Sequence, residues 1–379
     1  MNFDWDADDA RYRAEIRQFI REELPVGWRG YKTSDVAGYK EQSSRFSRTM
    51  AERGWLTQSW PVEYGGSDAS GWRQAILSEE LWSIGEPRGP QYMNVNWIGP
   101  AIMEYGTPEQ MSYHLNRISA GNVFWCQGFS EPDAGSDLAA LRCRAVRDGD
   151  NYVITGTKIW TSHVGLADFC FLLVRTDPEA PKHQGITVLL VRMDTPGMKV
   201  RHIDNFVEEQ ALHELIFDGV VVPVSCRLGE ENEGWTVVRR ALAFERVGAA
   251  HHQRALVNLD HIVDHAEQTG LIDDPEIQTR IGEAYAACEA ARLLYYRVVD
   301  LREKGNPPTP EANISRVSGT GCLRIVAELG HVVYGQEGLR EKSGGDDIRR
   351  VQSSSVAAGT REVQLDQIAL RYLNLPKSR

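Results

Sequence analysis

Apolar positions along this chain follow a helical spacing at both ends and a strand-like pattern in the middle. From residue 6 to residue 24 they recur at the helical interval, behind aspartates that suit the positive end of a helix dipole; they are Tyr12, Ile16, Phe19 and Ile20. Residues 107–110, Thr-Pro-Glu-Gln, offer an N-cap Thr, a Pro at the first helical position and a Gln able to close a capping box. The first third of the chain is therefore predicted to be helical.

Near residue 122 the pattern changes to short runs rich in β-branched and aromatic residues, which favour strands. The runs are 152–154, 169–174, 186–191 and 215–222. They are separated by Gly, Pro and Asp residues that suit tight turns, at 148–150, 177–178 and 195–197. This part of the chain is predicted to form a compact β domain.

After Gly234 the helical spacing returns in long stretches. These cover 235–268, 275–304 and 310–334, and a Gly-Asn-Pro-Pro breaker at 305–308 divides the last two. The chain has 379 residues, enough for more than one core. We expect an α+β fold with an N-terminal all-α domain (residues 1–121), a central β domain (122–228) and a C-terminal helical bundle (229–379).

The charge balance argues against one class of partner. The formal net charge is -11 and the sequence pI is near 5.5, whereas binding to nucleic acid phosphates is driven by clustered Lys and Arg. The six cysteines lie far apart without a Cys-x-x-Cys pair, which disfavours a zinc site or a disulfide framework. The acidic start is unlike a signal peptide, and no apolar run approaches the ~20 residues that span a bilayer. We expect a cytoplasmic protein.

Glu245 is an unusual carboxylate for a helix. The positions three and four residues away on either side hold only small or apolar residues, namely Ala241, Leu242, Gly248 and Ala249. In a helix its side chain would point along the apolar stripe toward the core or a cavity, where desolvation raises a carboxyl pKa toward the range that a general base needs. The alternative is a buried structural ion pair with an arginine such as Arg246 or Arg254.

Three short segments are candidates for ligand binding. Residues 129–137, Phe-Ser-Glu-Pro-Asp-Ala-Gly-Ser-Asp, mix hydroxyls with turn-forming residues, although a plain surface turn would look the same. Residues 158–162 place Trp160 beside two hydroxyls, where a flat ring could stack; core packing of this tryptophan is the alternative. Residues 358–362 form a predicted helix start with free backbone N–H groups.

Several common chemistries lack their motifs. His261 and His265 have the spacing of a helical metal pair and His251 and His252 are adjacent, but no acidic or cysteine ligand set accompanies them, so we expect no metal site. The chain also lacks a Gly-x-Gly-x-x-Gly after a strand, a Walker loop and a Gly-x-Ser-x-Gly elbow. Rossmann-type NAD binding and serine hydrolysis are therefore disfavoured.

Taken together, the order and spacing of these segments resemble the acyl-CoA dehydrogenase family across nearly the whole chain. Residues 129–137 resemble its Thr-Glu-Pro-x-Ala-Gly-Ser-Asp signature, 158–162 its Lys-x-Trp-x-(Thr/Ser) element, and 359–360 the Gly-Thr of its C-terminal signature. The resemblance implies that the β domain is a barrel and the C-terminal domain a four-helix bundle. It also implies an FAD cofactor at a subunit interface, usually within a tetramer.

The resemblance assigns cofactor and substrate positions residue by residue. It implies that the isoalloxazine ring of FAD is lined by Phe129, Ser130, Trp160 and Ser162. Thr360 and Glu362 match positions that touch FAD, and Ser136 matches a position on the CoA thioester side.

One departure concerns the catalytic base. Many members place a glutamate immediately before the C-terminal Gly-Thr, where this chain has Ala358. A subset that includes isovaleryl- and long-chain-type enzymes is similar in carrying the base on a helix, in a Glu-Arg pair like Glu245-Arg246. The resemblance implies that Glu245 removes the α-proton, that Arg246 contacts substrate, and that the backbone N–H of Ala358 polarises the thioester oxygen.

The implied activity is FAD-dependent oxidation of an acyl-CoA to the 2-enoyl-CoA, with electrons passed to an electron-transfer flavoprotein. An oxygen-using acyl-CoA oxidase or flavin monooxygenase is the alternative. An Arg-x-x-Phe-Gly element is missing around residues 271–275, and a Gly-Gly-x-Gly stretch is replaced at 333–338. Similar departures occur in bacterial members that act on steroid side chains or other bulky acyl groups, some of them heterotetramers with half of the FAD sites filled. We therefore expect a homotetramer or a heterotetramer; in the latter, the alternative role is a subunit without its own active FAD.

Overall fold

The structure, a computed structural model, describes residues 5–28, 30–31, 34–205, 211–245, 249–306, 309–339, 351, 353–357 and 359–376. In chain order it contains a helical region, a sheet region and a second helical region, which confirms the α+β class. Contacts within the chain divide it into two compact units. We call them the helical unit (residues 1–30, 69–87 and 246–379) and the sheet unit (31–68 and 88–245).

The predicted first helix is present as α1 (Ala7–Glu23). The Asp6 carboxylate caps it by accepting hydrogen bonds from the amides of Asp8 and Asp9, both at 2.8 Å, as an anion at the positive end of a helix does. The predicted apolar stripe faces inward through Tyr12, Ile16 and Phe19. The remaining N-terminal helices are α2 (Val36–Glu52), α3 (Gly71–Ser83), α4 (Gln91–Met93), α5 (Gly99–Tyr105) and α6 (Pro108–Ser119).

The start of α6 confirms the predicted capping box. Thr107 Oγ1 accepts from the Gln110 amide at 3.2 Å, and Gln110 Oε1 accepts from the Thr107 amide at 3.1 Å. The Gln110 side chain also donates to the carbonyls of Ser225 and Arg227, each at 2.8 Å. The cap therefore ties α6 to the chain around the last strand of the sheet, as well as satisfying the helix terminus.

His114 of α6 predicts a measurable pH dependence of stability. It is 6 % exposed, and burial followed by the charge of Arg117 lowers its pKa to about 4. The unfolded histidine, with a pKa near ~6.5, takes up its proton first as the pH falls, so stability is complete above that value and is lost as the pH falls toward 4. His114→Phe should reduce the loss of unfolding free energy between pH 7 and pH 5 by about 2 kcal/mol in urea titrations. An unchanged pH dependence would rule this histidine out.

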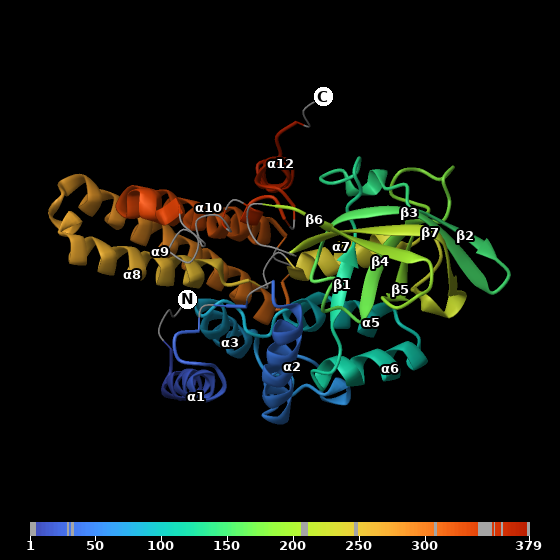
Figure 1. Ribbon diagram of the computed structural model, residues 1–379, viewed down its shortest axis with the longest axis horizontal. Coiled ribbons are helices and arrows are strands. Elements are labelled where there is room, and N and C mark those ends of the chain that lie inside the picture. The colour runs from blue at the N-terminus through green and yellow to red at the C-terminus, as the bar shows by residue number, and fades with distance from the viewer. Residues whose placement is uncertain are drawn as a thin grey trace. The chain divides into compact units, whose positions relative to one another are not determined.

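The sheet region forms one eight-stranded sheet in the order β6-β7-β3-β2-β4-β5-β8, with β1 paired to β4 (Figure 1). Its strands are β1 (Trp125–Gly128), β2 (Arg144–Asp148), β3 (Asn151–Ser162), β4 (Phe169–Arg175), β5 (Ile186–Arg192), β6 (Met198–Ile203), β7 (Leu212–Pro223) and β8 (Arg227–Leu228). All four predicted strand runs fall within β3, β4, β5 and β7. Closing a barrel requires the two end strands to exchange hydrogen bonds. In the described part of the chain β6 and β8 do not pair, so the predicted barrel is not confirmed.

The C-terminal helices confirm two of the three predicted stretches. They are α7 (Gly234–Glu245), α8 (His251–Thr269), α9 (Pro275–Glu303), α10 (Thr309–Tyr334) and α12 (Arg361–Arg371). A single helix over 235–268 is wrong, because α7 ends at Glu245 and α8 begins at His251, with Ala249 and Ala250 outside both.

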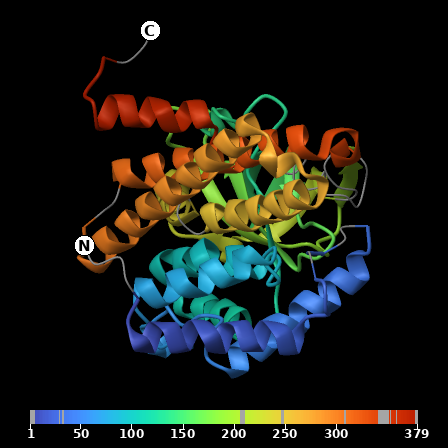
Figure 2. The same cartoon turned by 90° about the vertical axis from the view of Figure 1, so that its left-hand side faces the viewer.

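Helices α8, α9 and α10 lie side by side in the helical unit (Figures 1 and 2). They share an apolar core to which each contributes a stripe at helical spacing, including Leu259 and Ile262 from α8, Ala284 from α9, and Leu323 and Val326 from α10. This packing follows from the amphipathic pattern of the three segments. In the described residues, no helix has both the length and the apolar character that crossing a membrane requires.

Candidate functional site

The segment that opens the β region is fastened to β3 by a buried lysine. Lys158 is 0 % exposed, and its Nζ donates to Glu131 Oε1 at 2.7 Å and to the carbonyl of Phe129 at 3.1 Å. The amide of Ile159 donates to the carbonyl of Ser130 at 2.9 Å. Hydrogen bonds therefore join the predicted segments 129–137 and 158–162. Residues 129–131 are fixed to β3 and do not form a free surface turn.

Both carboxylate oxygens of Glu131 accept hydrogen bonds in this arrangement. Besides Lys158, it accepts from the amide of Arg142 at 2.6 Å and from the amide of Cys143 at 2.8 Å. A buried carboxylate and a buried ammonium are each costly alone, but paired and hydrogen-bonded they form a rigid anchor. The backbone at Phe129 and Ser130 is consequently held in place relative to β3.

Trp160 is displayed on the surface of the sheet unit by a bulge in β3. The register between β3 and β7 shifts between Lys158 and Thr161, and Trp160 has a φ of 60°, which is strained for an aromatic residue. Its side chain is 54 % exposed, so the alternative of core packing is wrong. Backbone strain of this kind persists where the surrounding structure determines it, and it is concentrated at functional sites.

Polar and aromatic groups also occur on β3, on β1 and on the segment that follows β1. Ser162 ends β3 and is exposed. Phe129 is partly buried, with its ring centroid 6.0 Å from that of Phe171. Gln127 lies on β1, two residues before Phe129. Its Nε2 atom is buried and has no hydrogen-bond partner among the described residues.

Gln127 was not identified from the sequence. Alternate residues of a strand point to the same face, so a polar residue two positions before a predicted ring contact is the signal that could have found it. A buried amide that lacks a partner is costly unless a ligand satisfies it. An exposed indole, an exposed hydroxyl and an unsatisfied amide are groups of the kinds that bind a flat heterocycle with polar edges.

The other predicted substrate and cofactor positions lie in separate places. Ser136 is exposed in the loop after the Glu131–Ala134 bridge of the sheet unit. In the helical unit Thr360 is the N-cap of α12, where its Oγ1 accepts from the Val363 amide at 3.2 Å, which confirms the predicted helix start. Glu362 is exposed in the first turn of that helix.

The predicted catalytic residues are the least completely described. Glu245 is the last residue of α7, and only its backbone is described. Ala249 lies outside α7 and α8, so it is not a helical neighbour of Glu245, and this part of the periodicity argument is wrong. Arg246 and Ala358 lie outside the described residues. No cluster of three or more His, Cys, Asp or Glu side chains suited to a metal occurs within the described ranges.

Models of three protein-family domains match almost all of this chain. The acyl-CoA dehydrogenase N-terminal domain matches residues 6–122, the middle domain 126–220 and the C-terminal domain 232–373. The acyl-CoA dehydrogenase FadE34 of Mycobacterium tuberculosis is 34% identical over 348 residues, covering 91% of this chain and 48% of the relative. The chain thus spans about half the length of that protein.

Two solved structures resemble the chain along its full length. The structure described as the Tcur3481-Tcur3483 steroid ACAD is 32% identical, with a TM-score of 0.90 and 100% of both chains covered. The ChsE4-ChsE5 complex from Mycobacterium tuberculosis is 31% identical, with a TM-score of 0.88 and 100% of both chains covered.

Proposed function

This chain belongs to the acyl-CoA dehydrogenase family, a family of oxidoreductases that act on acyl-CoA, and from this premise we propose that it catalyses FAD-dependent α,β-dehydrogenation of an acyl-CoA thioester. The product is the trans-2-enoyl-CoA. The observation that carries the proposal is Trp160, a half-exposed indole held on a strained bulge beside a segment anchored by a buried ion pair. A rigidly held aromatic ring of this kind suits stacking on a flat cofactor.

The cofactor contacts are proposed from the family resemblance and the local chemistry. FAD, when bound, supplies the acceptor for the hydrogen that leaves the β-carbon as hydride. Phe129 and Trp160 pack against its ring, while Ser130, Ser162 and the unsatisfied Gln127 amide satisfy its polar edges.

A second part of the cofactor is assigned to the start of α12. Thr360 and Glu362 stand at a helix N-terminus, where the helix dipole favours oxyanions and phosphate. We assign them to FAD away from the flavin ring.

We assign the proton transfer to Glu245 and the stabilisation of the thioester oxygen to the backbone of Ala358. Glu245 takes the α-proton as the carbon–hydrogen bond breaks, and the bonding electron pair moves onto the thioester oxygen. The backbone N–H of Ala358 donates to that oxygen, a role for which its methyl side chain is sufficient. Arg246 and Ser136 contact the CoA thioester and orient it.

The substrate class and the partners follow from the same proposal. A bulky acyl group of the steroid side-chain class is supported by the likeness to a steroid ACAD. An electron-transfer flavoprotein takes the electrons, in the cytoplasm. The protein assembles as a tetramer in this proposal, and the likeness to the ChsE4-ChsE5 complex supports a heteromeric form. Each chain then has domain boundaries near residues 121 and 228, with the sheet closing into a barrel and the C-terminal helices forming a four-helix bundle.

An anaerobic substrate panel tests this proposal. The FAD-loaded protein is mixed with butyryl-CoA, palmitoyl-CoA, isovaleryl-CoA and the CoA thioester of a steroid side-chain acid, and flavin absorbance is followed. We expect the fastest bleaching with the steroid thioester and formation of the matching 2-enoyl-CoA. Bleaching confined to butyryl-CoA would overturn the substrate class, and no bleaching with any thioester would overturn the dehydrogenation. Oxygen uptake during aerobic turnover would favour an oxidase.

A further inference from the structure

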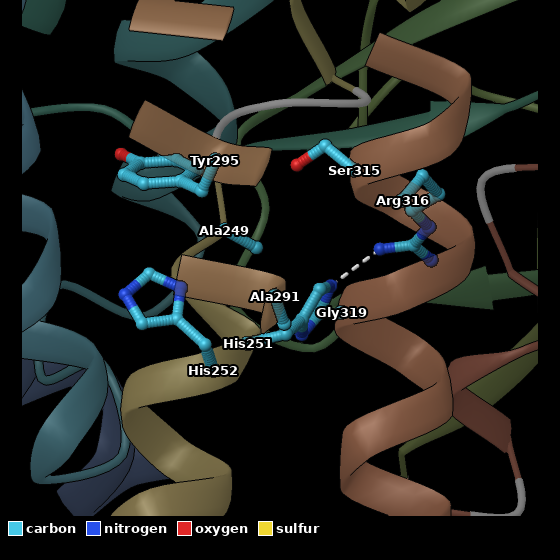
Figure 3. Close-up of a pocket in the computed structure, with 8 residues that line it drawn as sticks. All are labelled: Ala249, His251, His252, Ala291, Tyr295, Ser315, Arg316 and Gly319. Atoms are coloured by element: carbon cyan, nitrogen blue, oxygen red, sulfur yellow. Dashed lines mark hydrogen bonds between the residues drawn. The ribbon is translucent and has the colours of Figure 1, made fainter. Parts of the chain in front are cut away.

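A small pocket in the helical unit is polar but too small for a substrate (Figure 3). The space open to a water-sized molecule is about 10 Å³, which is the room of a single water. One polar pair in its wall is internal to the protein, because Arg316 Nη1 lies within hydrogen-bond distance of His251 Nε2, as the dashed line shows. A polar group on an acyl chain must therefore be met elsewhere in the protein.

The sheet unit buries a pair of amide side chains next to a wide helical turn. Gln91, in α4, and Asn94, the first residue of the π-helical turn η2 (Asn94–Ile98), are both 0 % exposed. Asn94 Nδ2 donates to Gln91 Oε1 at 2.7 Å and to the carbonyl of Val123 at 2.9 Å. Each amide keeps one unsatisfied atom, since Gln91 Nε2 and Asn94 Oδ1 have no hydrogen-bond partner among the residues that the structure describes.

One backbone carbonyl determines the orientation of both amides. A carbonyl only accepts, so the group of Asn94 that faces Val123 is the NH2. The same NH2 also faces Gln91, so the Gln91 oxygen lies on this side and its NH2 on the other. The pair therefore presents an unpartnered donor on Gln91 and an unpartnered acceptor on Asn94.

Two unpaired polar atoms in a fully buried position are destabilising, because the water that they lose on folding is not replaced. A hydroxyl group satisfies both, since its oxygen accepts one hydrogen bond while its O–H donates another. A ketone only accepts, so it would serve the Gln91 amide alone, and a methylene group would serve neither. The pair is therefore chemically matched to a hydroxyl.

The sequence fixes the wide turn that carries this pair. Pro100 has no N–H and cannot close an ordinary helical hydrogen bond, and the Gly99 amide donates to the Asn94 carbonyl, five residues back. The Trp60 indole donates to the Val95 carbonyl at 2.9 Å, and a Cβ on Gly99 would lie 2.3 Å from the Trp60 ring. Single π-turns are frequent at functional sites, and this one is held by tight packing.

The pair lies between two elements of the proposed active site. The turn η2 packs against α7, whose last residue is the proposed base Glu245. The chain runs from Val123, which orients Asn94, through β1 to Phe129, which is assigned to the flavin ring. The chain from residue 123 to residue 129 spans at most ~20 Å. The pair is therefore within reach of the remote end of a bulky acyl group whose thioester lies at the flavin.

We propose that Gln91 and Asn94 recognise a hydroxyl on the acyl group of the substrate: the Gln91 NH2 donates to the hydroxyl oxygen, and Asn94 Oδ1 accepts from the O–H. This inference rests on the proposed function and narrows its substrate class to steroid side-chain thioesters that carry a ring hydroxyl, remote from the reacting carbons. The hydroxyl is bound and is not changed by the reaction.

Matched analogues test this recognition by binding alone. Each is the CoA thioester of a steroid side-chain acid with sulfur in place of the β-carbon, so it binds without being oxidised. The parent has no ring oxygen, and the others carry one hydroxyl, each at a different ring carbon, or the corresponding ketone. In calorimetric titrations of the FAD-loaded protein, one alcohol should bind about 100-fold more tightly than the parent, a fraction of the ~10⁴–10⁵ that sites built around a substrate hydroxyl reach. Its ketone should bind about 10-fold more weakly than the alcohol.

Two variants remove the donor and the acceptor separately. Gln91→Met keeps the length of the side chain without the NH2, and Asn94→Leu removes the acceptor. Each should lower the preference for the alcohol over the parent about 10-fold, while the parent binds as before. Gln91→Met should also abolish the preference for the ketone over the parent, whereas Asn94→Leu should keep it, because the ketone uses only the donor.

Asn96→Leu is the matched control. Asn96 lies on the same turn, but its Nδ2 already donates to the Tyr92 carbonyl at 2.8 Å. This variant should keep the full preference for the alcohol, and a loss as large as that in Asn94→Leu would show that any change in the turn disturbs binding, which overturns the assignment to Gln91 and Asn94.

The outcomes separate this inference from the function on which it rests. If the oxidisable parent thioester bleaches the flavin but every alcohol binds within about 3-fold of the parent analogue, the pair holds only a buried water, and the inference fails while the proposed function stands. Full preference in both Gln91→Met and Asn94→Leu has the same meaning. If neither variant folds, the unsubstituted protein decides, and equal binding of alcohol and ketone overturns the inference. The expected preference without flavin bleaching by any thioester overturns the dehydrogenation and leaves hydroxyl recognition in place.

Discussion

Replacing Glu245 with Gln is expected to abolish reduction of the bound flavin by acyl-CoA while leaving FAD in place. The amide has nearly the shape of the carboxylate but cannot accept the α-proton, and a missing general base typically costs ~10²–10⁴-fold in rate. We expect the rate constant for flavin bleaching in anaerobic stopped-flow experiments to fall by at least ~10²-fold. Because the base works in the chemical step, the dissociation constant of acyl-CoA should change little.

A matched control guards against a general effect of removing a carboxylate from the sheet unit. Glu104→Gln removes a partly exposed carboxylate that pairs with Arg240 of α7 at 2.9 Å, and should reduce flavin at the normal rate. Near-normal bleaching by Glu245→Gln would exclude this residue as the base. Loss of FAD from Glu245→Gln would instead assign it to cofactor binding.

Replacing Lys158 with Met is expected to cause a large loss of stability in the sheet unit. The methionine fills much of the same space, but Glu131 is left as a buried carboxylate, 8 % exposed, without its cation. Breaking one partner of a buried ion pair costs ~3–5 kcal/mol. The Phe129 carbonyl also loses its donor, so the segment that carries Phe129 and Ser130 should loosen. We expect weaker FAD binding along with the lower unfolding free energy measured in urea.

Two variants show whether the uncompensated charge is the cause. Lys182→Met breaks an exposed pair with Asp137 and should cost no more than ~1 kcal/mol. In the double variant Lys158→Met with Glu131→Gln the buried charge is gone. The amides of Arg142 and Cys143 donate to different oxygens of Glu131, so the glutamine oxygen still serves one of them and part of the stability should return. A Lys158→Met protein within ~1 kcal/mol of the unsubstituted one would show that the ion pair contributes little.

Local signals in the sequence were sufficient for much of the secondary structure. The capping box at Thr107, the N-cap at Thr360 and the apolar stripe of α1 each involve residues within a few positions of one another. Helix caps and periodic faces are local interactions, so a short window contains all the partners. The strand runs were also predictable from local sequence, because β-branched and aromatic residues favour buried strands.

Interactions between distant segments decided what the local pattern could not. Lys158 looks like one lysine among many until Glu131, 27 positions away, is found beside it. Trp160 looks like a core residue until the β3–β7 register shift turns it outward. Periodicity predicted one helix over 235–268, but Ala249 and Ala250 lie outside α7 and α8.

By itself, then, the sequence determined the order of helical and sheet regions, the capped helix starts at Thr107 and Thr360, and the family. Only the tertiary structure decided which polar groups are buried, which aromatic ring is displayed, and which carbonyl Asn94 binds across 29 positions of chain. The physical reason is that burial and electrostatic pairing depend on distance in space, and contacts between residues far apart in the chain leave no periodic trace in the order of amino acids.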